Sequence, residues 1–239
     1  MVAVPASPSE RSSAHLVSPA FCQACGSPIS GELAPHACAQ CGEPQPVQVS
    51  EGEDFFQALG VARSFRLEGP ALEKRFYFLS RSLHPDRFAQ RGPQALKCSI
   101  ERMSLLNRAY RALKDSLQRR EHLLELEGIS GKKTPQAVPL DLADDWFELQ
   151  DVVMESPESA PQRLQEFVAR LSQLKSERKM RVESLEMRWE ESRTGTQSPD
   201  REALQLLARE LEAGATLASL ERDVARLTNR LGVTLGKSE

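Results

Sequence analysis

Two matching cysteine pairs near the start of the chain constrain its local fold more tightly than any other sequence feature. Cys22 and Cys25 form the first Cys-x-x-Cys pair, Cys38 and Cys41 form the second, and a glycine follows each pair. Two residues between the cysteines place both sulfurs on one side of a tight turn, and glycine permits the positive φ that turns backbone amides toward the thiolates. We therefore expect a closed, structural four-thiolate zinc site, with a redox dithiol or an iron centre as the alternative.

The segment that carries these cysteines, residues 21–46, is too short to bury a core of its own, so the metal would supply its folding energy. The preceding residues lack the apolar stretch of a secretory signal, which favours metal over disulfides. His36 lies between the pairs, and because four cysteines already complete the site we expect a solvated loop histidine. A short linker follows, so Cys22→Ser is predicted to destabilise this module alone.

Residues 52–129 have the apolar periodicity of amphipathic helices. A short helix is expected over 54–61, a second over 70–84, and a third over 93–127. The last two would pack antiparallel and present the tripeptide His84-Pro85-Asp86 at the tip of a hairpin, since proline disfavours helical geometry at the residue before it. The expected apolar stripes are Leu72, Phe76, Leu79 and Leu83 on the second helix, and Leu96, Ile100, Met103, Leu106, Ala109, Tyr110, Leu113 and Leu117 on the third.

The rest of the chain completes an all-α prediction. Aromatic residues make up only 5% of the sequence and strand-type runs are scarce, which argues against a sheet. Residues 1–20 are expected to be a disordered tail and 130–139, with two prolines, a linker. Over 140–235, heptad-like leucine spacing predicts a three-helix bundle with coiled-coil-like seams. The expected fold is thus a helical hairpin and a C-terminal three-helix bundle, with a small N-terminal zinc-binding module.

The hairpin with its His84-Pro85-Asp86 tip resembles the J-domain family. The resemblance rests on the opening DFFQALGV, the helix ending SLHPDR and the third-helix segment NRAYRALKDSLQRREHLL. It implies a co-chaperone that binds the ATPase of a DnaK-class chaperone, where the basic face would meet an acidic surface and the tripeptide would favour the hydrolysing state. The implied chaperone-binding residues are His84, Pro85, Asp86, Lys74, Arg75, Arg81 and Arg87.

A J-domain followed by a helical C-terminal bundle is similar to the HscB family, some members of which carry an N-terminal tetracysteine module. REHLLELEG resembles that family's junction between the two parts. The resemblance implies delivery of the iron–sulfur cluster scaffold protein to a DnaK/HscA-type chaperone. The client-binding helix of that family has a pattern similar to FLMEQLELRE. In this chain, Val153 and Ser156 stand where that pattern usually has glutamate. The apolar client-binding positions would be Phe147, Leu149, Val152 and Met154.

Other function classes are less well supported by the sequence. The net charge is −3 and residues 21–46 contain no lysine or arginine, so nucleic acid is not an expected partner. No stretch has the apolar length of a membrane helix, and no Gly-rich phosphate loop, open metal site or nucleophile–base pair suggests an enzyme. The alternative function is a J-domain adaptor for a different client, with the bundle used for self-association or another partner. The expected location is the cytoplasm, with the mitochondrial matrix as the alternative.

Overall fold

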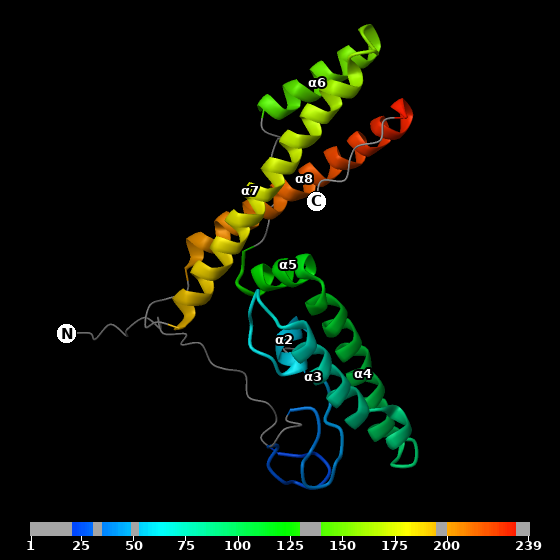
Figure 1. Ribbon diagram of the computed structural model, residues 1–239. Coiled ribbons are helices and arrows are strands. Elements are labelled where there is room, and N and C mark those ends of the chain that lie inside the picture. Colours follow the sequence, from blue (N-terminus) through cyan, green and yellow to red (C-terminus); the bar gives the residue numbers. More distant parts are fainter. Residues whose placement is uncertain (1–20, 31–34, 49–52, 130–139, 195–199, 233–239) are drawn as a thin grey trace, which may run out of the picture. The chain divides into compact units, whose positions relative to one another are not determined.

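The computed structural model describes residues 21–30, 35–48, 53–129, 140–194 and 200–232 (Figure 1). The predicted tail 1–20 and linker 130–139 lie outside the described residues. The chain divides into two compact units, one formed by residues 1–63 and 67–119 and the other by 64–66 and 120–239. The described residues contain helices and turns but no β-strand, which confirms the all-α class. None of the described helices has an apolar stretch long enough to cross a bilayer.

The first unit is built on a helical hairpin, α3 (Gly69–Ser82) and α4 (Pro93–Lys114), with the short helix α2 (Phe55–Leu59) packed against both. Asp54 caps α2, because its carboxylate accepts the amide N–H groups of the first turn. Between α3 and α4 the chain makes one 3-10 turn, Pro85–Arg87. The predicted hairpin with the His-Pro-Asp tripeptide at its tip is therefore present (Figure 1).

The apolar face predicted for the second helix is the buried face of α3. Leu72, Leu79 and Leu83 are buried, and the ring of Phe76 stacks on Tyr110 of α4 with 4.3 Å between centroids. The stripe predicted for the third helix is wrong at two positions, since Ile100 and Leu117 are 52% and 49% exposed. The inner face of α4 instead includes Ser99 and Arg102, because this helix is covered by the cysteine-containing segment as well as by α2 and α3.

The predicted third helix does not run unbroken to residue 127. It ends at Lys114, and a second helix, α5 (Ser116–Leu126), begins after Asp115. Asp115 has an extended backbone (ψ 123°), and its Oδ1 accepts the amide N–H of Gln118 at 2.8 Å. An aspartate that offers its carboxylate to the next turn competes with continuation of the helix. The break is thus a local consequence of the Asp115 side chain.

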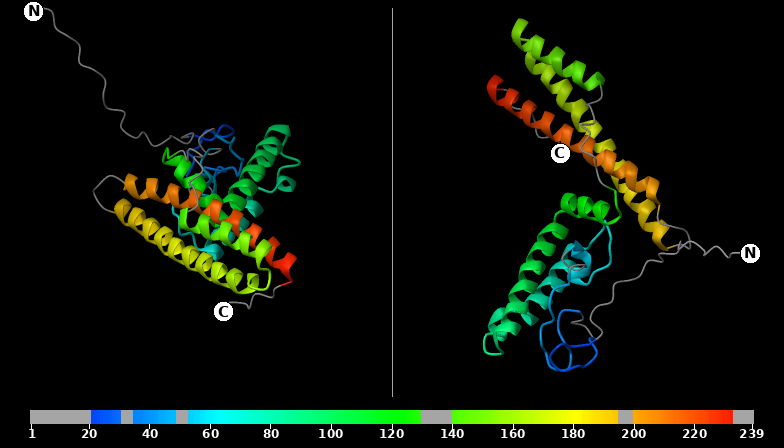
Figure 2. Two further views of the ribbon diagram at one scale, coloured as in Figure 1. Left: turned by 90° about the horizontal axis from the view of Figure 1, so that it is seen from above. Right: turned by 180° about the vertical axis from the view of Figure 1, so that it is seen from behind.

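The second unit contains three long helices, α6 (Leu140–Glu155), α7 (Ala160–Thr194) and α8 (Arg201–Leu231). Figure 2 shows α6 and α8 each lying along α7. The three helices share one apolar core, which confirms the predicted bundle. Its buried members are Leu142, Leu149, Leu164, Phe167, Leu171, Leu217, Leu220, Val224 and Leu227.

A short segment from the loop after α2 belongs to this second unit. The ring of Phe65 meets the fully buried ring of Trp189 edge-on, with 4.9 Å between centroids. Next to Trp189, the Glu190 carboxylate accepts the amide N–H of Phe65 at 2.8 Å and the hydroxyl of Ser64 at 2.6 Å. The loop between α2 and α3 therefore contributes the Phe65 ring to the packing around Trp189 of α7.

Candidate functional site

The tripeptide His84-Pro85-Asp86 forms an ordered turn whose polar side chains face solvent. The side chains of His84 and Asp86 are 52% and 91% exposed. Nδ1 of His84 accepts the amide N–H of Asp86 at 3.3 Å, and the 3-10 turn continues with the amide of Arg87 donating to the His84 carbonyl at 3.0 Å. The Asp86 carboxylate also lies 3.4 Å from His84 Nδ1. These contacts hold the turn in one shape, and both side chains stay exposed to solvent.

Buried residues on both sides of the turn anchor it to the hairpin. Leu83 and Phe88 are 0% and 3% exposed. The hydroxyl of Ser99 in α4 donates to the Leu83 carbonyl at 2.6 Å, which fastens the end of α3 to α4. The amide of Phe88 in turn donates to the Pro85 carbonyl at 2.9 Å. The exposed tripeptide is therefore supported by a packed base.

The basic residues predicted to bind the chaperone occupy two different environments. Lys74, Arg81 and Arg87 are exposed. Arg75 is half-buried, and its Nε donates to the Leu59 carbonyl at the end of α2 at 2.9 Å. Arg75 thus links α2 to α3, and the freely exposed part of the basic face consists of the other three residues.

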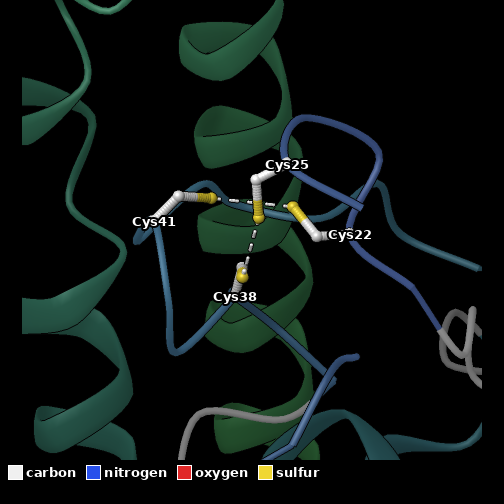
Figure 3. A group of neighbouring side chains, drawn as sticks. All are labelled: Cys22, Cys25, Cys38 and Cys41. Atoms are coloured by element: carbon white, nitrogen blue, oxygen red, sulfur yellow. Dashed lines mark hydrogen bonds between the residues drawn. The ribbon is translucent and has the colours of Figure 1, made fainter. Parts of the chain in front are cut away.

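The four paired cysteines converge on one point, as their spacing predicts (Figure 3). All four sulfurs lie within 4.8 Å of one another. Cys22 and Cys41 are 3.6 Å apart and Cys25 and Cys38 are 3.7 Å apart, sulfur to sulfur. Sulfurs bound tetrahedrally at about 2.3 Å from one ion would be about 3.8 Å apart. The residues therefore fit a four-thiolate metal site with no open position.

The backbone around the sulfurs has the geometry that such a site requires. Both glycines that follow the pairs, Gly26 and Gly42, have φ of 71°, as predicted. The amide N–H of Ala24 donates to the Cys22 sulfur at 3.4 Å. Hydrogen bonds from the side chain and backbone of Ser27 lower the pKa of the Cys25 thiol to about 6. The Cys25 thiolate is the form that would bind a metal.

His36 does not occupy the environment expected from the sequence. It is 1% exposed, and its Nδ1 accepts Nη1 of Arg102, a residue of α4, at 2.9 Å. Burial, together with the positive charges of Arg102 and Arg75, lowers the pKa of His36 to about 3, so the ring is neutral at neutral pH. The prediction of a solvated loop histidine is wrong, because the cysteine-containing segment packs on α4. The expectation that Cys22→Ser destabilises this module alone stays a prediction, and the hydrogen bonds from Arg102 of α4 to the segment argue against it.

The four predicted client-binding residues lie on α6 but not on one face. Phe147 and Met154 are 65% and 84% exposed, whereas Leu149 is 2% exposed and belongs to the bundle core. Val152 is half-buried. The exposed apolar pair is separated by two helical turns, so both side chains project from the same side of α6.

Acidic residues surround that exposed pair. Asp144 and Asp151 are exposed at helical spacing from Phe147 and Met154. The α6 sequence has six acidic residues and no lysine or arginine, and Arg163 and Arg170 of α7 pair with some of the carboxylates. Val153 packs against the core. A valine at this position, where the family pattern has glutamate, therefore leaves the charge on the exposed side of α6 unchanged.

Comparisons with known proteins agree with this arrangement. No protein-family model matches the chain. The co-chaperone protein HscB homolog of Vibrio cholerae serotype O1 (strain M66-2) is 35% identical over 85 residues, which cover 36% of this chain and 50% of the relative. The HscB homolog of Aromatoleum aromaticum (strain DSM 19018 / LMG 30748 / EbN1) is 31% identical over 105 residues, or 44% and 59% of the two chains.

Over the matched residues this chain is similar to the HscB co-chaperones. The matched region spans about half the length of the first of these curated relatives. The crystal structure of human co-chaperone protein HscB aligns with a TM-score of 0.60 at 23% identity, covering 87% of this chain and 98% of that one. The HscB fold therefore extends over most of the chain, well beyond the segment that is similar in sequence.

Several residues around the tripeptide and the cysteines could not be identified from the sequence. Arg102 and Gln45 are 1% exposed and connect the cysteine module to α4. Arg91, in the loop after the His-Pro-Asp turn, donates Nη1 to the Cys41 carbonyl at 3.1 Å. Arg102 lies one turn before Leu106, beside the predicted apolar stripe of the third helix. Its position so close to the stripe is the sequence feature that indicates a buried polar contact.

Proposed function

We propose that this HscB homologue stimulates ATP hydrolysis by a DnaK/HscA-type chaperone and delivers the iron–sulfur cluster scaffold protein to it. The observation that carries the proposal is the exposed His84-Pro85-Asp86 turn on its buried anchors Leu83 and Phe88. In this proposal the chain has no catalytic site of its own. It acts in the cytoplasm, as an effector that binds the hydrolysing state of the chaperone more tightly than the resting state.

The exposed cations and the exposed turn would act at different stages of binding. Lys74, Arg81 and Arg87 would attract an acidic surface of the chaperone ATPase, which raises the rate of encounter and is weakened by salt. The tripeptide would make the state-dependent contacts, because its side chains project from the hairpin. Encounter and stimulation are thereby separable by mutation.

The client would bind the exposed side of α6. Phe147 and Met154 supply an apolar contact, while Asp144 and Asp151 favour a partner that carries basic residues beside apolar ones. Leu149 would support this surface from beneath, since it packs in the core. We take the iron–sulfur scaffold protein as the client because of the homology to HscB co-chaperones.

Steady-state ATP hydrolysis tests the proposal directly. We expect wild type to stimulate one of the organism's DnaK-class chaperones, and the scaffold protein to raise that stimulation further. Phe147→Ser with Met154→Ser is expected to weaken scaffold binding by about tenfold or more, measured by calorimetry, because two exposed anchors are lost. Met187→Ser, an exposed methionine on α7, is the matched control and should bind normally.

The outcomes separate the two parts of the proposal. Stimulation without any response to the scaffold would assign the chain to a different client and leave the chaperone function in place. Scaffold binding that ignores both substitutions on α6 would move the client surface elsewhere. A chain that stimulates no chaperone of the organism would contradict the proposed function.

The four-thiolate site is proposed to hold structural zinc. We expect about one zinc ion per chain, because four cysteines leave no open position for substrate or water. Cys38→Ser should lose most of the metal, measured by elemental analysis of the purified chain. Cys98→Ser should keep it, since Cys98 is a buried cysteine outside the cluster. Equal metal loss in both variants would contradict the assigned ligands.

A further inference from the structure

A buried arginine joins the cysteine module to α4. The guanidinium of Arg102 is 1% exposed. Its Nε donates to the Gln45 carbonyl, Nη2 donates to the Pro46 carbonyl at 2.8 Å, and Nη1 donates to His36 Nδ1 at 2.9 Å. A buried guanidinium is costly unless its donors are satisfied, and here the module's own backbone satisfies them. The folding of the module and of α4 is therefore coupled through this side chain.

The same contacts lead directly to the cysteines. The side-chain amide of Gln45 donates to the Cys22 sulfur at 3.4 Å and to the Glu43 carbonyl at 2.9 Å. The backbone amide of Gln45 donates to the His36 carbonyl at 2.8 Å. Any loosening of the cysteine turns would consequently displace the carbonyl and imidazole groups that receive Arg102.

A second arginine connects the module to the His-Pro-Asp turn. Arg91 donates Nη1 to the Cys41 carbonyl at 3.1 Å, and its guanidinium lies 5.6 Å from the centroid of the Phe88 ring. The backbone amide of Arg91 donates to the Phe88 carbonyl at 3.0 Å, and the amide of Phe88 donates to the Pro85 carbonyl. The loop that follows the tripeptide is thus hydrogen-bonded, through Arg91, to the backbone of Cys41 in the cluster.

From these contacts we infer that metal bound at the tetracysteine site orders the His84–Arg91 loop, with Arg91 and Arg102 as the positioning residues. Four thiolates held by one ion fix the two cysteine turns, and these fix the carbonyls that receive the two guanidinium groups. Without metal the receiving groups lose their fixed positions, and the loop keeps only its contacts within the hairpin. Metal supply would then set how well the turn is prepared to meet the chaperone.

The test measures the loop itself in the full-length chain. Amide hydrogen exchange of Arg87, Phe88 and Arg91 is followed by NMR in zinc-loaded and chelated protein. Chelation is expected to speed exchange at these amides by about tenfold in wild type, the scale of one lost charge-assisted hydrogen bond. Arg91→Ala should exchange faster even with zinc, and chelation should change its loop amides less than about twofold.

Arg108→Ala is the matched control for Arg91→Ala, because Arg108 is an exposed arginine on α4. Its loop amides should respond to chelation as in wild type. Arg102→Lys keeps a charge but loses the forked donors, and it should lower the zinc-dependent gain in thermal stability of the hairpin. Loop amides that exchange at the same rate with and without zinc in wild type would overturn the inference.

The link to chaperone activity depends on the proposed function, whereas the loop measurement does not. Chelated protein is expected to stimulate ATP hydrolysis several-fold less than zinc-loaded protein at the same concentration. Loop amides that respond to zinc in a chain that stimulates no chaperone would support the inference and contradict the proposed function. Full stimulation by a chelated chain would overturn the role of the metal in preparing the turn.

Discussion

Replacing His84 by glutamine is expected to reduce stimulation of chaperone ATP hydrolysis by about tenfold or more while the fold stays intact. The His84 side chain is 52% exposed, and the packed base of the turn consists of other residues, chiefly Leu83 and Phe88. Removal of the imidazole is therefore expected to cost a contact with the partner, and the hydrogen bond that it loses within the turn is the one from the Asp86 amide. Glutamine retains a carbonyl oxygen that can accept the Asp86 amide in place of Nδ1.

Single-turnover hydrolysis of ATP by the chaperone, with the co-chaperone in excess, measures this loss. Gln90→Ala is the matched control, since Gln90 is an exposed residue of the same loop outside the predicted chaperone-binding set. Thermal unfolding of both variants should match wild type within a few degrees. If His84→Gln stimulates hydrolysis as strongly as wild type, the tripeptide is not the effector. The basic face of α3 would then be the next region to test.

The hairpin and the cysteine cluster could be predicted because their signals are local. A Cys-x-x-Cys-Gly turn depends on residues within five positions, and both turns adopt the expected left-handed glycine. The approximate end of α3 likewise follows from Pro85, although the helix ends at Ser82, two residues before the predicted end. Each of these features rests on a steric rule for neighbouring residues, which any single sequence displays.

The environment of His36 could not be predicted, because it depends on a residue 66 positions away. Nothing near His36 in the sequence announces Arg102, and an arginine on a helix is ordinarily taken as solvated. The same holds for Phe65, a loop residue whose partner Trp189 lies 124 positions later in α7. Tertiary contacts of this kind decide burial, whereas periodicity reports only which side of a helix tends to be apolar.

The α6 helix shows where periodicity was informative and where resemblance was misleading. Leu149 was expected to face a client and instead packs in the core, as its spacing from Leu142 indicates. Val153, taken as a lost acidic position, also faces the core. The family pattern matches residues by their order along the chain. Whether a residue faces the core or the solvent depends instead on its position around the helix.

Replacing Trp189 by alanine is expected to lower the free energy of unfolding of the second unit by about 3–5 kcal/mol, the loss typical of a large aromatic removed from a core. Trp189 is fully buried, and its ring contacts Phe65 edge-on and lies 4.8 Å from the guanidinium of Arg193. Urea unfolding followed by circular dichroism gives the loss. Fluorescence of Trp146, which packs against Phe167 in the bundle core, reports the same unit in the variant.

Met187→Ala controls for the loss of side-chain area on α7, because Met187 is 46% exposed two residues from Trp189. We expect it to change stability by less than about 0.5 kcal/mol. Phe65→Ala then tests the loop contact by a double-mutant cycle with Trp189→Ala. Two rings in edge-on contact should show a coupling energy of about 0.5–1.5 kcal/mol. Strict additivity of the two losses would mean that Trp189 is stabilised by α7 and its neighbours alone, and that Phe65 contributes only its own burial.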